Sequence, residues 1–289
     1  MASYCRPTTL DEALAIRAER PVTVLAGGTD VYPARANRVG WGDMRRDEIL
    51  DVSAIGELRG MTQTADRLRL GALTTWTDLR RAALLPAFAG YQLAARDVGG
   101  AQVQNRGTLV GNICTASPAG DGIPCLLSLD AEIELASTRG RRTLPVGEFL
   151  TGYRKTACAA DEIVTAILIP EPKAGAAGGF LKLGARRYLV ISIAMAAAVV
   201  ATDETGTITH AAIAVGACSE VARRLTDLEA DLVGQPLAAA SDLMTPAHFS
   251  ALKPIGDIRA SGQYRDSAAR DLVADLLAGL AGAGDRRAA

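Results

Sequence analysis

Two glycine-rich segments about eighty residues apart constrain this chain more than any other feature. The first loop is Ala26-Gly27-Gly28-Thr29-Asp30, and the second loop, from Gly107 to Asp121, reads GTLVGNICTASPAGD. Each follows or contains a short apolar run. Each also gathers Gly, Thr, Ser or Asn, with which a backbone can turn sharply and direct its N–H groups at a negative charge. Together the two loops predict a cradle for phosphate groups.

Length and composition predict a soluble globular protein of two domains. The 289 residues exceed one ordinary core, since single cores stop growing near ~250–300 residues. No apolar run reaches the ~18–20 residues of a membrane span, and the N-terminus lacks a signal-peptide pattern, so the cytoplasm is the expected location. A net charge of −1 argues against a nucleic-acid partner, which usually requires a basic patch.

The cysteines and histidines form no recognisable metal or redox pattern. The five cysteines are widely spaced and include no C-x-x-C pair, which argues against a disulfide framework, a zinc site or a cluster held by this chain. The two histidines, His210 and His248, nearly exclude histidine-based metal sites and catalytic triads. We therefore expect buried free thiols.

The first part of the chain mixes short strands with helices. Thr9 and Glu12 form a capping box before a helix that Pro21 ends. Residues 22–26 form a short buried strand that leads into the first loop, at a strand end where open α/β sheets bind ligands. Further strands are expected at 49–52, 67–72, 131–136 and 163–169, and a helix at 74–85.

A change of pattern near residues 170–179 marks the best domain boundary. Its two prolines and three glycines are not expected to continue a helix or a strand. Two long apolar strands follow, at 193–201 and 207–217, joined by a hairpin connection. Helices are expected from about Val221 and over 263–280. The chain is therefore predicted to be α+β, ending in a smaller antiparallel sheet backed by helices.

Neither loop matches a common nucleotide signature. G-x-G-x-x-G and G-x-x-x-x-G-K-[ST] are both absent, so neither a Rossmann site nor a P-loop is present. Taken alone, the first loop is also compatible with a tight β-turn that needs a positive φ, and the second with a glycine-rich surface loop. Asp121 has two interpretations as well, a ribose contact or the N-cap of a helix through Leu126 and Leu127.

The paired loops closely resemble the FAD signatures of the medium, flavin-carrying subunit of the xanthine dehydrogenase and carbon monoxide dehydrogenase family of molybdenum hydroxylases. Three further stretches agree with that family. They are Gly152-Tyr153-Arg154-Lys155-Thr156 with Asp161-Glu162-Ile163 and Ile169-Pro170, Phe180-Leu181-Lys182 with Arg186-Arg187, and Asp257-Ile258-Arg259-Ala260-Ser261 with Tyr264-Arg265. Five ordered motifs across nearly the whole chain are far more specific than either loop alone.

The resemblance implies an α+β fold of two domains. Residues 1–172 would form a two-part FAD-binding domain of the vanillyl-alcohol-oxidase (PCMH) type. Residues 178–284 would form a domain like the CO dehydrogenase flavoprotein C-terminal domain, an antiparallel sheet plus helices.

The resemblance also implies which residues bind FAD. Backbone amides of the segment matching Val24, Leu25, Ala26, Gly27, Gly28, Thr29, Asp30 and Val31 wrap the pyrophosphate in relatives. The second-loop residues implied to hold pyrophosphate and ribose are Gly107, Thr108, Gly111, Asn112, Thr115 and Asp121. Positions matching Val164 and Lys182 flank the isoalloxazine, where a cation favours the reduced flavin anion. The alternative for Lys182 is a lysine whose stem lies along a strand.

The chain departs from the family pattern at several positions. Val110 stands where relatives usually have a second glycine, which we interpret as a small local change. The cysteine-rich insertion that binds an extra iron–sulfur cluster in some relatives is missing, so Cys114 and Cys125 are expected to be packing residues. Tyr188 lies where relatives often carry another side chain near the flavin, and its role stays open.

The resemblance finally implies shared chemistry. A large partner with a molybdopterin cofactor would hydroxylate the substrate, and a small partner with two [2Fe–2S] clusters would relay electrons to the FAD of this chain. The acceptor would be NAD, a quinone or oxygen, and the assembly a dimer of heterotrimers. Two alternatives stay open. A stand-alone flavin oxidase of the same fold would need a substrate base and often a covalent histidine, and a flavin-free interaction subunit would carry the loops as relics.

Overall fold

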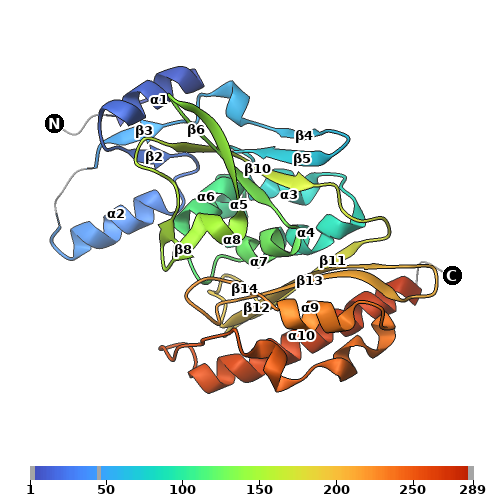
Figure 1. The fold of residues 1–289 in the computed structure, drawn as a ribbon. Helices are drawn as coiled ribbons and strands as arrows, with labels where there is room; N and C mark the ends of the chain where they lie inside the picture. The colour runs from blue at the N-terminus through green and yellow to red at the C-terminus, as the bar shows by residue number, and fades with distance from the viewer. Residues whose placement is uncertain (1–3, 44–46, 286–289) are drawn as a thin grey trace.

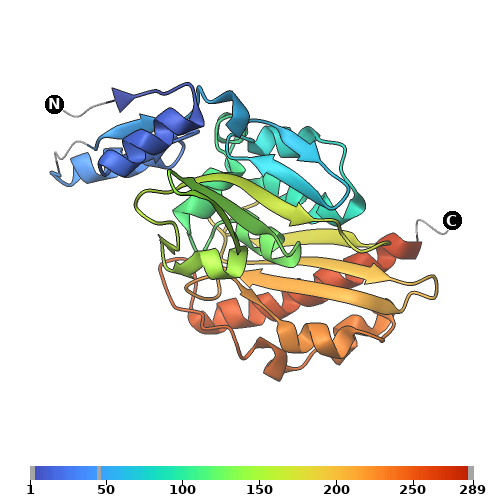
Figure 2. The same cartoon turned by 45° about the horizontal axis from the view of Figure 1, so that its top comes forward.

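The computed structural model describes residues 4–43 and 47–285, whose elements lie in layers (Figure 1). A small N-terminal sheet and a five-stranded sheet lie on one side of a group of helices, and a four-stranded sheet lies on the other side. The C-terminal helices cover the outer face of that last sheet, as the turned view also shows (Figure 2). Among the described residues, no helix combines the length and apolar character that crossing a membrane requires.

A small parallel sheet, of strand order β1-β3-β2, leads into the first loop. Its strands are β1 (Tyr4–Cys5), β3 (Ile49–Asp51) and β2 (Thr23–Leu25). Helix α1 (Leu10–Glu19) joins β1 to β2, and α2 (Val31–Gly40) begins directly after the first loop. Thr9 caps α1 by accepting a hydrogen bond from the Glu12 backbone N–H at 3.3 Å, as predicted. The Glu12 carboxylate, however, accepts from the N–H of Thr8.

The five-stranded antiparallel sheet has the order β4-β5-β10-β6-β7. Its strands are β4 (Met61–Gln63), β5 (Arg67–Gly71), β10 (Ile163–Pro170), β6 (Glu132–Ser137) and β7 (Gly140–Pro145). The helices between β5 and β6 are α3 (Trp76–Arg81), α4 (Ala89–Asp97), α5 (Ala101–Gln104), α6 (Leu109–Thr115) and α7 (Gly122–Ser128). The second loop contains α6 and ends at the start of α7. It therefore lies within the helical layer between the sheets.

Short elements complete this part of the fold. They are the 3₁₀ turns η1 (Gly56–Leu58) and η2 (Pro86–Phe88), helix α8 (Val146–Phe149), and the two-stranded ribbon of β8 (Leu150–Gly152) and β9 (Lys155–Thr156). The β8–β9 ribbon contains the first of the three further family motifs. Its turn contacts the second loop, as described below.

The four-stranded sheet joins the two parts of the chain. Its strands, in spatial order, are β11 (Ala177–Leu183), β12 (Ala194–Thr202), β13 (Ile208–Gly216) and β14 (Arg223–Arg224), all antiparallel. Helices α4 and α7 pack on one face. The other face is covered by α9 (Thr226–Leu232) and α10 (Gly262–Asp285), with the 3₁₀ turns η3 (Leu237–Leu243) and η4 (Pro246–Phe249) nearby.

Strand β12 is buried on both faces, which explains its unbroken apolar sequence. Met195, Ala197, Val199 and Ala201 face the core shared with α4 and α7. Ala194, Ala196, Ala198 and Val200 face the core shared with α9 and α10. Because successive side chains of a strand point to opposite faces, one strand separates two hydrophobic cores. The many alanines let helices approach the sheet closely from both sides.

The structure confirms most predicted elements and corrects three. The helix predicted at 74–85 is shorter, because α3 ends at Arg81 and the chain leaves the helix at Ala82. The Ala82 carbonyl accepts a hydrogen bond from the Gln92 side chain at 2.8 Å. The helix expected from Val221 begins at Thr226, since β14 extends the sheet first. The glycines at the end of the predicted boundary belong to β11, where a Cβ atom on Gly178 would lie 2.0 Å from the Ala87 carbonyl oxygen of η2 and one on Gly179 would lie 2.6 Å from the Leu276 side chain of α10.

Candidate functional site

The two glycine-rich loops meet in space although about eighty residues separate them. A Cβ atom on Gly27 would lie 1.9 Å from the carbonyl oxygen of Arg106, and a Cβ atom on Gly107 would lie 3.1 Å from Thr29 Oγ1. Only residues without a side chain allow this approach at Gly27. The contact brings the first loop against the start of the second.

The first loop presents unused hydrogen-bond donors. Within the described residues, no group accepts a hydrogen bond from the backbone N–H groups of residues 27–30. Gly28 has a φ of 75°, the left-handed region that favours glycine. The N-terminus of α2 follows at once and adds the positive end of a helix dipole. Several adjacent donors beside a helix start form a fitting site for a phosphate anion.

Asp30 ties the first loop to the second. Its carboxylate accepts a hydrogen bond from Thr115 Oγ1 at 3.1 Å and lies 3.8 Å from Arg154 Nη1. The Arg154 backbone N–H donates to the Ala116 carbonyl at 3.0 Å, with Arg154 in the left-handed region at the turn between β8 and β9. The first family motif after the loops therefore supports their geometry.

The second loop folds into a capped helical turn. Thr108 is the N-cap of α6, and its Oγ1 accepts a hydrogen bond from the Gly111 N–H at 2.9 Å. The same hydroxyl keeps its proton, which can be donated to a ligand oxygen. Asn112 is half-buried on α6, and its Oδ1 faces Gly122 so closely that a Cβ atom there would lie 3.0 Å away. Thr108 therefore directly follows Arg106 and Gly107, which the first loop contacts, whereas Asn112 faces the start of α7.

Asp121 is the centre of a buried polar cluster. Asp121 Oδ2 accepts a hydrogen bond from Lys182 Nζ at 2.6 Å, and Oδ1 accepts one from Ser192 Oγ at 2.6 Å. The side chains of Asp121 and Lys182 are 7% and 9% exposed, so this is a buried ion pair. Burial raises the pKa of the Asp121 carboxyl, although the Lys182 ammonium and Ser192 oppose that shift.

The structure removes one of the two alternatives that the sequence left at Asp121 and at Lys182. Asp121 does not cap α7 through its side chain, because both carboxylate oxygens are turned to the second part of the chain. Lys182 does not lie with a free ammonium along β11, because it pairs with Asp121. Sequence reasoning missed Ser192, which precedes an apolar strand and carries no local signal of its role.

The remaining predicted residues occupy varied positions. Val164 is buried on β10, at a register irregularity between Val164 and Ala166, and β10 packs against α6. Val24 and Leu25 lie on β2 and pair with Leu50 and Asp51. Tyr188 is 61% exposed, and the Arg187 guanidinium lies over its ring, 5.2 Å from the centroid.

The cysteines follow the prediction in part. All five are free thiols, and Cys125 is buried, with its Sγ donating to the Gly90 carbonyl. Cys114 is instead solvent-accessible on the second loop. No cluster of three or more metal-binding side chains occurs within residues 4–43 and 47–285.

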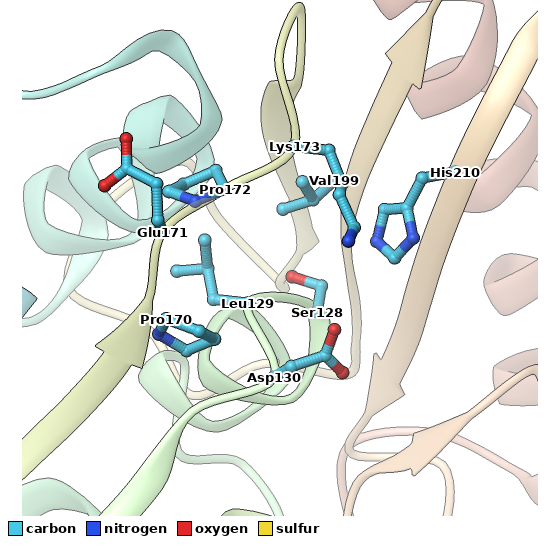
Figure 3. Close-up of a pocket in the computed structure, with 9 residues that line it drawn as sticks. All are labelled: Ser128, Leu129, Asp130, Pro170, Glu171, Pro172, Lys173, Val199 and His210. Carbon is cyan, nitrogen blue, oxygen red and sulfur yellow. The ribbon is translucent and has the colours of Figure 1, made fainter. Parts of the chain in front are cut away.

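A hollow at the other end of α7 is separate from the loops (Figure 3). Lys173 and His210 approach each other across it, near Asp130. Asp130 is already paired with Arg224 Nη1 at 2.7 Å. The hollow takes no residue from either loop, and the seven-residue helix α7, about 10 Å long, separates it from Asp121. We therefore assign the candidate site to the loops.

Comparisons with known proteins identify the family of the chain. The family described as FAD binding domain in molybdopterin dehydrogenase matches residues 1–172, and the CO dehydrogenase flavoprotein C-terminal domain matches residues 180–280. The chain belongs to the family of FAD-binding subunits of molybdenum hydroxylases. The resemblance and the α+β fold expected from the sequence are thereby confirmed.

Individual relatives cover most of the chain. The nicotinate dehydrogenase FAD-subunit of Eubacterium barkeri is 32% identical over 241 residues, 81% of this chain and 80% of the relative. The solved carbon monoxide dehydrogenase of Hydrogenophaga pseudoflava, which lacks the Mo-pyranopterin moiety, superposes with a TM-score of 0.86 at 28% identity, covering 96% of both chains. Quinoline 2-oxidoreductase from Pseudomonas putida 86 superposes with a TM-score of 0.86 at 26% identity, covering 98% of both.

Proposed function

We propose that this chain holds one noncovalent FAD where the two loops meet and carries electrons for a molybdenum hydroxylase. The observation that carries the proposal is the row of N–H donors at residues 27–30, for which the described part of the chain supplies no acceptor. The Gly27 contact holds this row against the second loop. A pyrophosphate needs such a row of donors, because its oxygens carry charge on several sides.

The binding residues follow from the family pattern and from the local geometry. Residues 24–31 would hold the pyrophosphate through backbone amides, with help from the second-loop residues Gly107, Thr108, Gly111, Asn112 and Thr115. Asp121 would accept from a ribose hydroxyl with a remaining lone pair, since each carboxylate oxygen has two. Lys182 and Val164 would flank the isoalloxazine. Lys182 would then keep Asp121 ionised and place positive charge near the ring.

The partners are proposed from the family. A large molybdopterin subunit and a small subunit with two [2Fe–2S] clusters would complete a heterotrimer, and two heterotrimers a dimer. Bound FAD would supply the step between single-electron and paired-electron transfer. This chain would position the cofactor between the iron–sulfur partner and an acceptor, which is NAD, a quinone or oxygen. We propose a cytoplasmic location and a division into domains 1–172 and 178–284.

The stand-alone oxidase is less well supported by the structure. Such an enzyme often links its flavin to a histidine, yet both histidines lie elsewhere. His248 is buried and contacts Asp231 Oδ2 at 3.0 Å in the second part of the chain. His210 lines the hollow at the far end of α7.

A visible spectrum of the purified full chain tests the proposal. We expect flavin absorption at one FAD per chain and complete release of the yellow colour on acid precipitation. Flavin retained on the precipitated polypeptide would instead support the covalent oxidase. A colourless protein that takes up no added FAD would support the interaction subunit. Co-purification with a molybdopterin subunit and an iron–sulfur subunit tests the assembly.

A further inference from the structure

One buried arginine of the C-terminal helix is connected to the second loop through hydrogen bonds of the backbone. Arg265, in the first turn of α10, is 4% exposed. Its Nη1 donates to the carbonyls of Ile193 and Ala217, the latter at 3.1 Å, and its Nη2 donates to Asp257 Oδ1 at 2.7 Å. Arg265 is the last residue of the third further family motif, which begins at Asp257. The proposed electron transfer assigns no role to this motif.

Ala217 connects this arginine to the second loop. The Ala217 carbonyl accepts from Arg265, while its N–H donates to the Pro118 carbonyl at 2.9 Å. Ala217 has a φ of 60°, a conformation that residues with a side chain rarely adopt. Contacts on both sides are therefore needed to hold this peptide in its orientation.

Ser192 makes a second connection. The Ile193 carbonyl is held by the same Nη1, and the Ile193 N–H donates to the Leu183 carbonyl at 2.8 Å. The adjacent Ser192 is 1% exposed and donates to Asp121 Oδ1 at 2.6 Å. The guanidinium thus fixes the backbone that presents Ser192 to Asp121.

We propose that Arg265 is a positioning residue for the second loop. It holds the carbonyls of Ile193 and Ala217 together, and through Ser192 and Ala217 it sets the places of Asp121 and Pro118. The second part of the chain would in this way determine the geometry of a loop that belongs to the first.

The chemistry of the group suits this role. A guanidinium is a planar fork with donors in fixed directions, whereas a lysine ammonium is a compact charge and cannot serve three acceptors in the same arrangement. Asp257 stays ionised beside it. The backbone N–H of Arg259, together with Arg265 and Arg259 side chains, lowers the pKa of Asp257 to about 2. The ion pair that anchors the fork therefore persists over the whole physiological pH range.

Hydrogen exchange of the full chain without FAD tests the inference directly. In Arg265→Lys we expect the Ala217 amide, and peptides covering residues 116–122, to exchange about tenfold faster, while β10 is unchanged. A tenfold change corresponds to about 1.4 kcal/mol. Arg259→Lys is the matched control, because Arg259 Nη1 pairs with the same carboxylate at 3.0 Å but contacts neither carbonyl. It should leave the loop unchanged.

FAD binding gives the second readout, which rests on the proposed function. We expect Arg265→Lys to weaken FAD about tenfold, with Arg259→Lys near wild type. Combined with Ser192→Ala, the two losses should be less than additive, because one substitution acts through the other. Additive losses would mean that Arg265 stabilises the fold without positioning Asp121, and would overturn the inference.

The outcomes separate the inference from the proposed function. Wild-type protein that binds no FAD contradicts the proposed function, while faster exchange confined to the loop still supports the role of Arg265. Unchanged exchange, or faster exchange throughout the chain, overturns that role. If Arg265→Lys does not fold, Asp257→Asn removes the negative charge that faces both Arg265 Nη2 and Arg259 Nη1. It should accelerate exchange at the same amides by a smaller factor, and Arg259→Lys controls for the lost Arg259 pair.

Discussion

Asp121 and Lys182 form the ion pair with the largest electrostatic consequence at the site. Both side chains are less than a tenth exposed, and their closest atoms are 2.6 Å apart. Taking two charges out of water is unfavourable unless each finds a partner, so removing either leaves the other uncompensated. The raised pKa of Asp121 shows that burial outweighs its partners.

Lys182→Met should therefore lower the free energy of unfolding by about 3–5 kcal/mol at neutral pH. A raised folded-state pKa means that the folded chain binds more protons, so stability falls as pH rises through that pKa. The loss should accordingly shrink at acidic pH, where Asp121 takes up a proton. Urea denaturation at pH 5 and pH 8 measures this, with the exposed Lys173→Met as control. Equal losses at both pH values would contradict the ion-pair explanation.

Gly28→Val should abolish FAD binding. Gly28 has a φ of 75°, which valine adopts only with strain, and a Cβ atom there would lie 2.8 Å from the Tyr32 ring. Gly60→Val is the matched control, since Gly60 has a φ of 84° but no described atom within 4 Å of an added Cβ atom, apart from its chain neighbours. Fluorescence titration with FAD should show binding in the control alone. If Gly28→Val folds and still binds FAD at full occupancy, the first loop is only a structural turn.

Helix α4 and the 3₁₀ turn η2 before it contact strand β11 through their backbones. A Cβ atom on Gly90 would lie 2.4 Å from the carbonyl oxygen of Gly179, and one on Gly178 would lie 2.0 Å from that of Ala87. Lys182 lies on the same strand, so this contact fixes how far the lysine lies from the helical layer. Glycine at these positions is a packing requirement, although glycine weakens a strand in general.

Gly90→Ala should destabilise the protein although alanine favours helices. The added methyl group would push α4 away from β11, and overpacking of this kind typically costs about 1–3 kcal/mol. Gly279→Ala in α10 makes the same exchange where no described atom outside the helix's own backbone lies within 4 Å of the added Cβ atom, and it should stabilise by about 0.5–1 kcal/mol. Thermal unfolding of both variants measures the difference. Changes of the same sign would show that helix propensity dominates.

The molecule as a whole is organised around the four-stranded sheet. One face of β12 belongs to the core under the loops and the other to the core under α10. Three contacts, from Lys182, Ser192 and Ala217, reach from this side to the second loop. The second part of the chain therefore completes the candidate site rather than serving as a separate module.

The purified chain with FAD alone should oxidise no small substrate, whereas the proposed assembly with a molybdopterin subunit and an iron–sulfur subunit should. The sequence offers neither a motif histidine nor paired cysteines for substrate chemistry or a cluster. Steady-state assays with dye acceptors, with and without the two partner subunits, provide the measurement. Turnover by the chain alone would favour the stand-alone oxidase.

Several features of this chain were predictable because their signals are local. The loops, the Thr9 cap, and the apolar strands β12 and β13 follow from patterns within a few residues of each other. The resemblance of the ordered motifs identified the family, which the comparisons confirm. The FAD contacts named from those motifs stay predictions.

Only the tertiary structure decided how the loops are held. The approach of Gly27 to Arg106, the pairing of Asp121 with Lys182, and the contact of Ser192 join positions about sixty to eighty residues apart. A periodic pattern shows which face of an element is buried, but not what it is buried against. In the sequence, Asp121 stands directly before a helix, so an N-cap is a natural interpretation when its spatial partners are unknown. Its partners come from strands whose distance in space depends on how the sheets and helices pack together.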